Sequence, residues 1–427
     1  MTDLQDAARR VLSANDRGGY TVPTPRLYPF QWNWDSAFVA MGFALFDVER
    51  AVTELEWLVR GQWADGMIPH IVFHQPSDSY FPGPDVWRTP HTPVPTSGIT
   101  QPPVFAMALK AILDAARQKK VQLEPGRIAR LFDAALAFHR WWYAARDPDG
   151  TGLVALLHPW ESGSDNSPAW DAALARVPVT TTTPVRRKDT GHVDAAMRPR
   201  DEDYARFIHL VDLYADCGWD PVEQWRRTPF RIADIQTTAI LARAGEDLAA
   251  VADGLGRTDE ASEIRAMVVR SRTALAGAWR DALGRFVSRD LVSREDVTAP
   301  TQASFLPLLA LDLAPARRDA AEREMRGWCE GLAVAFPSTP RSSPHFEAKR
   351  YWRGPVWAVI NWLLIDGLER NGLAEFAADL RQGTVAAIER VGFCEYFDPV
   401  TGEGCGGEGF SWTAAAYLHF TAMSART

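Results

Sequence analysis

The sequence of 427 residues has little of what marks secreted, metal-binding or membrane proteins. It holds only four cysteines and no Cys-x-x-Cys pair, so it predicts neither a disulfide framework nor a zinc site. No apolar run reaches membrane-spanning length, and the first residues lack the basic and apolar stretches of a signal peptide. We therefore expect a cytoplasmic protein with reduced cysteines at Cys217, Cys329, Cys394 and Cys405.

An excess of positive charge is also missing. The formal net charge is −8, which argues against nucleic acid or an anionic membrane as a partner. His70 and His74 have the spacing of two metal ligands on a helix, but the sequence offers no third ligand beside them. We therefore predict no metal and no cofactor.

Tryptophan and helical periodicity, by contrast, are abundant. The 17 tryptophans exceed the needs of a core, and many lie in polar or proline-rich stretches, which favours a ligand-facing aromatic surface. Residues 356–365 are apolar nearly all round and predict a helix buried on every side. Amphipathic helical spacing recurs in segments 48–59, 104–115, 131–142, 258–282, 317–331 and 373–390. We infer an all-α fold of two concentric helix layers in a single domain over residues 1–427, with small hairpins only, such as one at 285–288.

Two long irregular segments interrupt the helices. Residues 76–103 carry eight prolines, and residues 177–200 carry a run of four threonines followed by Arg186, Arg187 and Lys188. Loops of this length in a compact domain are usually functional. We expect the proline-rich segment to be stiff, the threonine-rich segment to be mobile and the three basic side chains to be solvated. Both segments are predicted to act as lids over a binding site.

Acids and aromatic rings gather in four short segments. The first, 158–171, holds three acids and two tryptophans around a Gly-Ser turn, and its Ser167 and Pro168 are typical of a helix start. This pattern presents Asp165 from a loop. The other three segments are 28–36, before a helix expected from about Ala37, then 349–357, and 393–407, which ends in a glycine-rich turn. Rings that stack on sugars and carboxyls that transfer protons are what carbohydrate chemistry needs.

Together these segments resemble the α-glycosidases of glycoside hydrolase family 63 and, more distantly, the family 37 trehalases. The matching motifs are Trp-x-Trp-Asp-Ser at 32–36, Glu-Ser-Gly-x-Asp at 161–165, Tyr-Trp-Arg-Gly-Pro-x-Trp at 351–357 and Glu-Tyr-Phe-Asp-Pro at 395–399. The resemblance runs from about residue 26 to the C-terminus. It implies an (α/α)6 barrel of six inner and six outer helices with the site in the funnel at one end. Because of its compact length, the chain is most similar to the small bacterial branch of the family, whose members hydrolyse glucosylglycerate and mannosylglycerate.

The resemblance implies inverting hydrolysis of 2-O-α-glucosyl- or mannosyl-D-glycerate to the free sugar and glycerate. It assigns Asp165 as general acid and Glu395 as general base, with Glu408 as the reserve candidate for the base. An inverting pair stands about 6.5–9.5 Å apart, with room for one water. The implied sugar contacts are Tyr28, Trp32, Trp34, Asp35, Gln101, Trp160, Gly163, Tyr351, Trp352 and Trp357.

Contacts on the leaving-group side are expected from Arg198 and Tyr204, and from Tyr80 in the first lid segment. A guanidinium there can grip the glycerate carboxylate with two hydrogen bonds. The expected partner is thus a small α-glycoside.

Three alternatives stay open. The first is hydrolysis of another small disaccharide by a trehalase-like enzyme or α-glucosidase. The second is a sugar epimerase or isomerase on the same barrel, which would use paired histidines where these clusters hold Asp and Glu. The third is a non-catalytic sugar-binding protein, which needs aromatic platforms but no matched acid and base. These contrasts favour a hydrolase.

Overall fold

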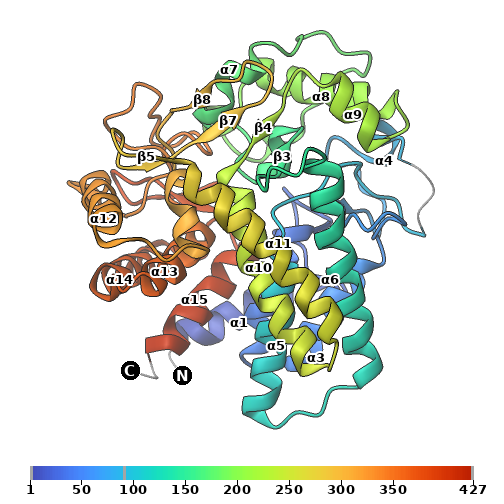
Figure 1. The fold of residues 1–427 in the computed structure, drawn as a ribbon, viewed down its shortest axis with the longest axis vertical. Helices are drawn as coiled ribbons and strands as arrows, with labels where there is room; N and C mark the ends of the chain where they lie inside the picture. The colour runs from blue at the N-terminus through green and yellow to red at the C-terminus, as the bar shows by residue number, and fades with distance from the viewer. Residues whose placement is uncertain (1–2, 90–92, 425–427) are drawn as a thin grey trace.

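The structure of the protein is a computed structural model, which describes residues 3–89 and 93–424 (Figure 1). Six elements form a closed ring in which each packs against the next and the last packs against the first. Every residue of the first is buried, and so is most of the fifth, as the apolar run at 356–365 predicts. In chain order they are α2 (Asn33–Ala44), α5 (Phe105–Lys119), α10 (Ile235–Gly254), the 3-10 helix η5 (Gln302–Leu309), α13 (Ala358–Arg370) and α15 (Ser411–Ser424).

Further helices cover this ring from outside. Asp47 begins one of them by accepting a hydrogen bond from the N–H group of Arg50, which confirms the predicted cap. The pairs are α1 (Asp3–Asn15) on α15, α3 (Val48–Val59) on α2, α6 (Pro125–Arg146) on α5 and α10, α11 (Thr258–Gly277) on α10, and α14 (Ala374–Val391) on α13. The chain is therefore mostly helical, as predicted.

The strands are short and antiparallel. Three sheets have two strands: β1 (Gln31–Trp32) with β2 (Ile71–Val72), β5 (Trp279–Arg280) with β6 (Arg285–Phe286), and β9 (Tyr396–Phe397) with β10 (Gly404–Cys405). The helix α12 (Pro315–Cys329) lies against β6. A fourth sheet has the order β3 (Ala155–Leu156), β4 (Ile232–Ala233), β7 (Ser288–Asp290) and β8 (Asp296–Val297). The hairpin near residue 285 is confirmed, whereas the sequence does not predict the four-stranded sheet, because its strands are short and far apart along the chain.

The longer helix α8 and several short helices surround the ends of the ring that carry the sequence motifs. They are α4 (Pro84–Trp87), η1 (Pro159–Ser162), η2 (Pro168–Trp170), α7 (Asp171–Leu174), η3 (Asp189–Gly191), η4 (Ala195–Met197), α8 (Asp201–Ala215) and α9 (Pro221–Arg227). Both predicted lid segments lie among them, although residues 90–92 of the first lie outside the described residues.

The mobility of the second segment stays a prediction, and the expected solvation holds for Arg186 and Lys188, which are exposed, but is wrong for Arg187. The threonines of this segment are tied to α8, because the Asp212 carboxylate accepts hydrogen bonds from the hydroxyls of Thr181 (2.6 Å) and Thr183 (2.5 Å). Arg187 is not solvated: its side chain is 8% exposed and forms an ion pair with Asp189 at 2.7 Å. In both cases the partner is a buried carboxylate, Asp212 for the threonines and Asp189 for Arg187.

The start of α2 differs from the expected one. The helix begins at Asn33, four residues before Ala37, directly after the extended Trp32 of β1. Its first N–H groups find partners outside the helix: that of Asn33 donates to the His70 carbonyl (3.1 Å) and that of Trp34 to the Gln101 side chain (3.4 Å). The Trp-x-Trp-Asp motif therefore lies in the first turn of an inner helix.

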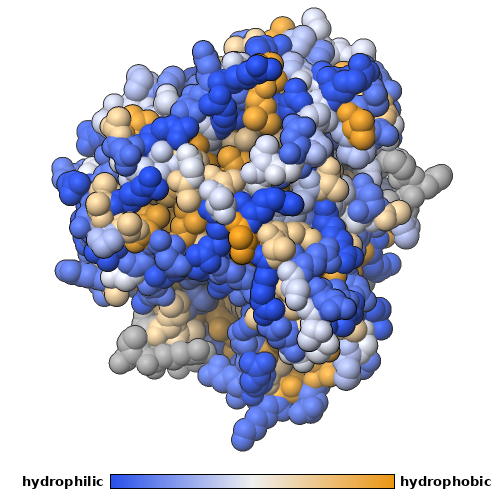
Figure 2. Space-filling model, viewed as in Figure 1, coloured by the Kyte–Doolittle hydropathy of each residue, from blue (hydrophilic) through white to orange (hydrophobic). Residues whose placement is uncertain are grey.

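The face of the molecule shown in Figure 2 is mostly hydrophilic, with apolar side chains in small groups. No helix within the described ranges is long and apolar enough to cross a membrane.

Candidate active site

A cavity opens where four of the inner elements begin. Of the predicted site residues, those that line it are Tyr28, Trp32, Trp34, Asp35, Tyr80, Gln101, Trp160, Gly163, Asp165, Arg198, Tyr204, Tyr351 and Glu395. The cavity walls also include residues that the sequence analysis did not name as site residues: Pro23, His70, Asp189, Pro199, Phe410 and Trp412. Segments from across the whole chain thus meet in one small space.

Trp352 and Trp357, expected as sugar contacts, are not among the lining residues. Their rings stack on each other with centroids 3.8 Å apart, and the indole N–H of Trp357 donates to the Tyr351 carbonyl at 3.2 Å. They form a layer behind the wall that supports Tyr351 and Trp34. These side chains are too well packed by their neighbours to face the cavity.

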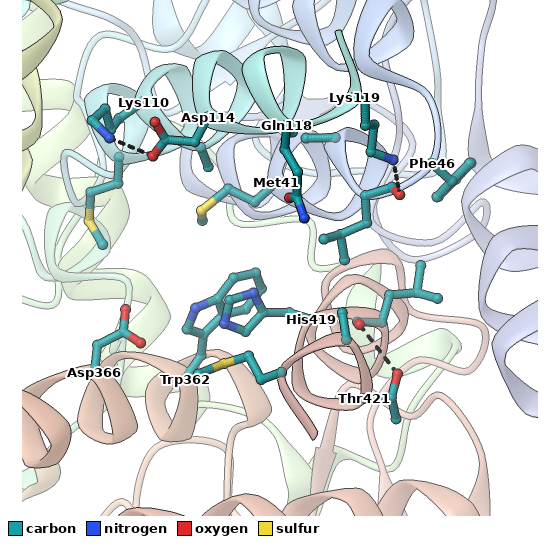
Figure 3. A pocket seen from close by; sticks show the side chains of 18 of the residues that line it. Met41, Phe46, Lys110, Asp114, Gln118, Lys119, Trp362, Asp366, His419 and Thr421 are labelled. Carbon is teal, nitrogen blue, oxygen red and sulfur yellow. Dashed lines mark hydrogen bonds and ion pairs between the residues drawn. The ribbon is translucent and has the colours of Figure 1, made fainter. Parts of the chain in front are cut away.

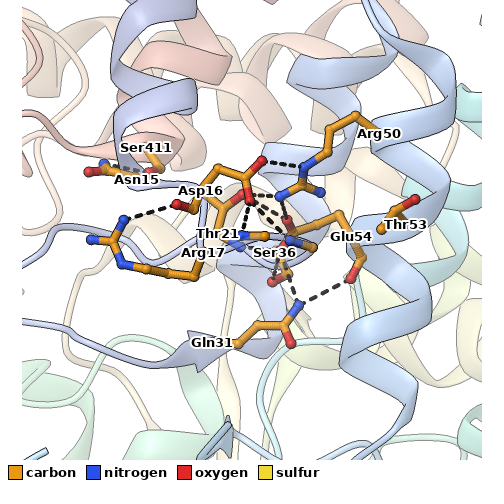
Figure 4. Close-up of polar contacts among 12 residues, drawn as sticks. Asn15, Asp16, Arg17, Thr21, Gln31, Ser36, Arg50, Thr53, Glu54 and Ser411 are labelled. Carbon is orange, nitrogen blue, oxygen red and sulfur yellow. Dashed lines mark hydrogen bonds and ion pairs between the residues drawn. The ribbon is translucent and has the colours of Figure 1, made fainter. Parts of the chain in front are cut away.

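A buried polar cluster fixes the loop before α2 (Figure 4). Glu54 of α3 is fully buried and accepts hydrogen bonds from Gln31 (3.0 Å) and Ser36 (2.6 Å), on either side of the Trp-x-Trp-Asp motif. It also accepts from the Thr21 hydroxyl (2.7 Å), and Arg50 balances its charge at 2.9 Å. Because each donor belongs to a different part of segment 21–36, the carboxylate holds that segment in one conformation.

Asp165 lies in the turn between η1 and η2. Ser162 accepts from the N–H group of Ser164 (2.8 Å), and the Trp170 indole donates to the Ser164 carbonyl (2.8 Å), so both backbone polar groups of the residue before Asp165 are fixed. Gly163 has a φ of 69°, and a Cβ there would come within 2.6 Å of the Trp34 ring. Only glycine therefore allows this turn to approach the cavity wall so closely.

A buried ion pair also anchors the loop that carries Asp165. Glu161 of the Glu-Ser-Gly-x-Asp motif does not line the cavity; it pairs with Arg146 of α6 at 2.7 Å and accepts from the N–H group of Leu157 at 2.8 Å. Both charged side chains are at most 1% exposed. Removing either partner would leave a buried charge uncompensated, so the pair fixes the loop that carries Asp165.

Burial raises the pKa of Asp165 to about 8. The nearby carboxylates of Glu395 and Asp189 add to this effect, and the Arg198 guanidinium opposes it. The carboxyl therefore keeps its proton at neutral pH and can donate it to a bound ligand.

Glu395 lies before β9, with its carboxylate held at both oxygens. The Tyr28 hydroxyl donates to one oxygen (3.0 Å) and the N–H group of Gly407 to the other (3.0 Å), while the Arg198 guanidinium is 3.6 Å away. Burial raises its pKa above the ordinary value, and Arg198 and these donors work against that rise. Gly406 has a φ of 73°, and a Cβ there would meet the Glu395 carboxylate at 2.3 Å. The glycine-rich turn thus wraps around the carboxylate.

The reserve candidate, Glu408, is exposed and does not line the cavity. Glu403 is exposed too and pairs with Lys349 at 2.5 Å. Asp35 is the third carboxyl of the cavity, and burial together with Glu395 raises its pKa well above the ordinary value. Its place in the first turn of α2, among tryptophans, suits contact with a sugar hydroxyl.

Arg198 is buried at the junction of these groups. It donates to the Tyr28 hydroxyl (2.8 Å) and to Asp189 (3.1 Å), and its guanidinium lies 4.1 Å from the centre of the Tyr351 ring. Its Nη1 atom has no hydrogen-bond partner within the described part of the chain. This atom lies 3.6 Å from the Glu395 carboxylate, so it forms an ion pair there but no hydrogen bond.

Asp189 is a site residue that sequence reasoning missed. It carries two ion pairs, with Arg187 and Arg198, and these hold its pKa at about 2 against the effect of burial. The basic residues 186–188 directly before it indicate an ion pair with Asp189. No rule of sequence spacing, however, marks Asp189 as a site residue. Trp412, in contrast, follows Phe410 at a helix start, the same aromatic pattern that marked the other clusters.

No three His, Cys, Asp or Glu side chains are placed to hold a metal ion in residues 3–89 and 93–424. One carboxyl that keeps its proton and a second that is held by an arginine share a cavity walled by aromatic rings. Two carboxyls with separate protonation states are the apparatus of glycoside hydrolysis. The site defines a glycoside hydrolase.

Comparison with known proteins agrees. The chain belongs to the family described as the mannosylglycerate hydrolase MGH1-like glycoside hydrolase domain, whose model matches residues 28–413. It is 46% identical to a mannosylglycerate hydrolase of Thermus thermophilus over 97% of this chain and 99% of that protein. It is 36% identical to a glucosylglycerate hydrolase of Mycolicibacterium hassiacum over 98% of this chain and 97% of that protein.

Solved structures extend the comparison. A family 63 mannosylglycerate hydrolase from Thermus thermophilus, in complex with Tris and D-glycerate, is similar with a TM-score of 0.92 at 46% identity, over 98% of this chain and 100% of that chain. A neutral trehalase from Saccharomyces cerevisiae shares the fold only, with a TM-score of 0.58 at 16% identity over 97% of this chain and 79% of that chain. The predicted resemblance to family 63, and more distantly to trehalases, is confirmed.

Proposed function

We propose that this protein is an inverting α-glycosidase that hydrolyses 2-O-α-mannosyl- or 2-O-α-glucosyl-D-glycerate to the free sugar and D-glycerate. The observation that carries the proposal is the meeting, in one cavity, of the carboxyls Asp165 and Glu395 with the guanidinium of Arg198, whose Nη1 atom makes no hydrogen bond within the described residues. The higher identity to the mannosylglycerate hydrolase favours the mannosyl substrate. All four cysteines are free, which supports a reducing compartment such as the cytoplasm.

Asp165 acts as the general acid. Its carboxyl proton passes to the glycosidic oxygen while the bond between that oxygen and the anomeric carbon breaks. Glu395 takes a proton from water, and the water oxygen forms the new bond to the anomeric carbon on the opposite face of the ring. The reaction leaves Asp165 ionised and Glu395 protonated, and exchange with solvent restores both.

Arg198 holds the glycerate carboxylate. A guanidinium binds a carboxylate with short, charge-assisted hydrogen bonds, and the Nη1 atom is available for this. Tyr204 and Tyr80 line the same cavity and flank the aglycone. The tyrosine hydroxyls stay protonated, because burial raises the pKa of both further above its ordinary value.

The two long segments act as lids. Tyr80 and Gln101 of the first, and Asp189 and Arg198 of the second, contribute to the cavity wall. The Tyr204 hydroxyl of α8 donates to the Phe81 carbonyl at 2.9 Å and joins the first segment to the helix that also holds the second. Closure of both segments over the substrate excludes bulk water and long oligosaccharides.

The ring of six elements is the inner layer of an (α/α)6 barrel, and the chain forms a single catalytic domain. The closed order of packing and the outer helices on the ring support this arrangement. One inner position is taken by the 3-10 helix η5, whose Pro307 cannot continue an α-helical hydrogen-bond pattern.

The function is tested by offering mannosylglycerate, glucosylglycerate, trehalose and kojibiose and following product formation by proton NMR. We expect release of glycerate from one or both of the first two substrates and little turnover of the disaccharides. Preferred cleavage of trehalose or kojibiose would overturn the proposed substrate, and conversion of free sugars without hydrolysis would indicate an epimerase.

A further inference from the structure

His70 lines the sugar cavity, yet the reaction described above gives it no task. It directly precedes β2, and its backbone is fixed at both polar groups: its N–H donates to the Ile99 carbonyl (2.7 Å), and its carbonyl accepts from the N–H of Asn33 (3.1 Å). The side chain is only 5% exposed. The imidazole is therefore held in one place at the wall of the cavity.

Aromatic rings surround this imidazole. It stacks on Trp160 at 6.0 Å with an angle of 24° between the rings, and it meets Trp32 and Trp87 edge-on at 6.4 Å. Its Nδ1 atom is buried and has no hydrogen-bond partner within the described residues. Burial lowers the pKa of His70 well below its ordinary value, as does the nearby His158, so the ring is neutral and offers one donor and one acceptor.

A second buried histidine shows what a structural role looks like here. His158 also packs on Trp160, at 4.7 Å, but its Nδ1 atom accepts from the N–H of Trp160 (3.1 Å) and its Nε2 atom donates to the Phe207 carbonyl (3.0 Å). Both of its nitrogens are used within the protein. Leaving a buried polar atom without a partner lowers stability, so the open nitrogen of His70 calls for a functional explanation.

We propose that His70 is a substrate-binding residue that forms a hydrogen bond with a hydroxyl group of the sugar ring bound against Trp32 and Trp160. The proposal rests on the proposed function, because it requires a sugar in this cavity. The part of the imidazole that lines the cavity offers this hydrogen bond.

The variant His70→Phe keeps an aromatic ring against Trp160 and removes both nitrogens. We expect kcat/KM for the better glycosylglycerate to fall about 10-fold, the size of one neutral hydrogen bond, while Tm stays equal or rises because an unpartnered polar atom is gone. The control His158→Phe removes two hydrogen bonds made within the protein and is expected to lower Tm.

Substrate analogues deoxygenated singly at C2, C3, C4 or C6 identify the bound hydroxyl. One analogue should lose much less rate with His70→Phe than with the wild-type protein, because the partner is already absent. Unchanged kcat/KM in His70→Phe, or equal losses for every analogue in both proteins, would overturn the proposal.

If the wild-type protein cleaves neither glycosylglycerate, the proposed function fails but His70 can still be tested. Calorimetric titration with D-mannose and D-glucose then compares the wild-type protein with His70→Phe. Weaker sugar binding by the variant supports the hydrogen bond. Equal affinity, or no sugar binding by the wild-type protein, overturns it.

Discussion

The cavity at the start of the inner helices and the groove at their far ends are both lined by acids and aromatic rings, but their charges are arranged differently. The groove is the larger hollow, with a volume of about 790 Å³ against about 60 Å³ for the cavity. Figure 3 shows α5 on one side of it and α13 and α15 on the other, and the labelled residues include Lys110, Asp114, Lys119, Trp362, Asp366 and His419.

Most charges in the groove pair with each other. Lys110 pairs with Asp114 at 2.5 Å, Arg243 pairs with Asp247 at 2.6 Å, and Lys119 donates to the Leu45 carbonyl. At the other end, Arg198 pairs with Asp189 at 3.1 Å and Glu395 at 3.6 Å, but Asp165 forms no ion pair within the described residues. The Asp165 carboxyl therefore remains available to a substrate.

A shifted pKa does not distinguish the two ends. Burial raises the pKa of Asp366 in the groove to about 7 and that of Asp165 in the cavity to about 8. The groove also holds an arginine-held carboxylate, since Asp247 pairs with Arg243 beside Asp366. Asp165 differs in its surroundings, because it and Glu395 share a cavity walled by tryptophan and tyrosine rings. A perturbed acid therefore becomes informative when a second carboxyl and aromatic platforms for a sugar lie beside it.

The sharpest test of this comparison is to neutralise one acid at each end. Asp165→Asn should lower kcat by about 10²–10⁴-fold because the leaving oxygen loses its proton donor, while substrate still binds. The matched variant Asp366→Asn should keep kcat within about twofold. Steady-state kinetics on a glycosylglycerate measure both. A larger loss in Asp366→Asn would mean that the groove, not the cavity, holds the reaction.

The base is tested in the same way with the two glutamates of the glycine-rich segment. Glu395→Gln should lower kcat by at least about 10²-fold, since an amide cannot take the proton from water. Glu408→Gln should stay active because its side chain is exposed and outside the cavity. An inactive Glu408→Gln beside an active Glu395→Gln would reverse the assignment.

A variant of Arg198 tests whether its guanidinium binds the glycerate carboxylate. Arg198→Ala should raise KM for glucosylglycerate about 10–100-fold, which corresponds to loss of a charged hydrogen bond, and should raise KM for neutral glucosylglycerol far less. Both substrates are affected equally if Arg198 acts through Glu395. A larger increase in KM for glucosylglycerate than for glucosylglycerol therefore measures the contact of Arg198 with the glycerate carboxylate. Arg198→Lys should recover part of the affinity. Equal increases in KM for both substrates would show that Arg198 does not bind the glycerate carboxylate.

The pH profile follows from the two carboxyls. Asp165 must be protonated, so kcat/KM should fall about tenfold per unit above its pKa of about 8. Glu395 must be ionised, so kcat/KM should also fall as the pH drops through the pKa of Glu395. Because that pKa is raised, the fall should begin at a higher pH than for an ordinary glutamate. Asp366→Asn should leave both limbs unchanged. A profile that is flat to pH 10 would contradict the role of Asp165.

Sequence alone predicted much of the scaffold. The helical spacing located α3, α5, α6, α11, α12, α13 and α14, and Asp47 gave a correct start for α3, but the spacing did not locate α1, α10, η5 or α15. The motifs, together with the family resemblance and the expected lids, named most of the residues that line the cavity. These successes depend on local patterns, because helix periodicity and turn chemistry act within a few residues.

The failures mostly involve partners distant in sequence. The first turn of α2 depends on His70 and Gln101, and the buried position of Arg187 depends on the Pro199 carbonyl and the α8 residue Tyr204 as well as on Asp189. Trp352 and Trp357 match their motif but pack against one another behind the wall. A single sequence carries no signal for which nitrogen of His70 remains without a partner, since that follows from tertiary packing.

The most direct test of the account is the stereochemical course of the reaction. Proton NMR recorded within the first minutes on wild-type protein with mannosylglycerate or glucosylglycerate shows which anomer of the sugar is released, before mutarotation. Asp165 and Glu395 acting on opposite faces of the ring predict the β anomer first. The α anomer first would require a covalent intermediate and a carboxyl separation of about 5 Å, and would contradict the proposed mechanism.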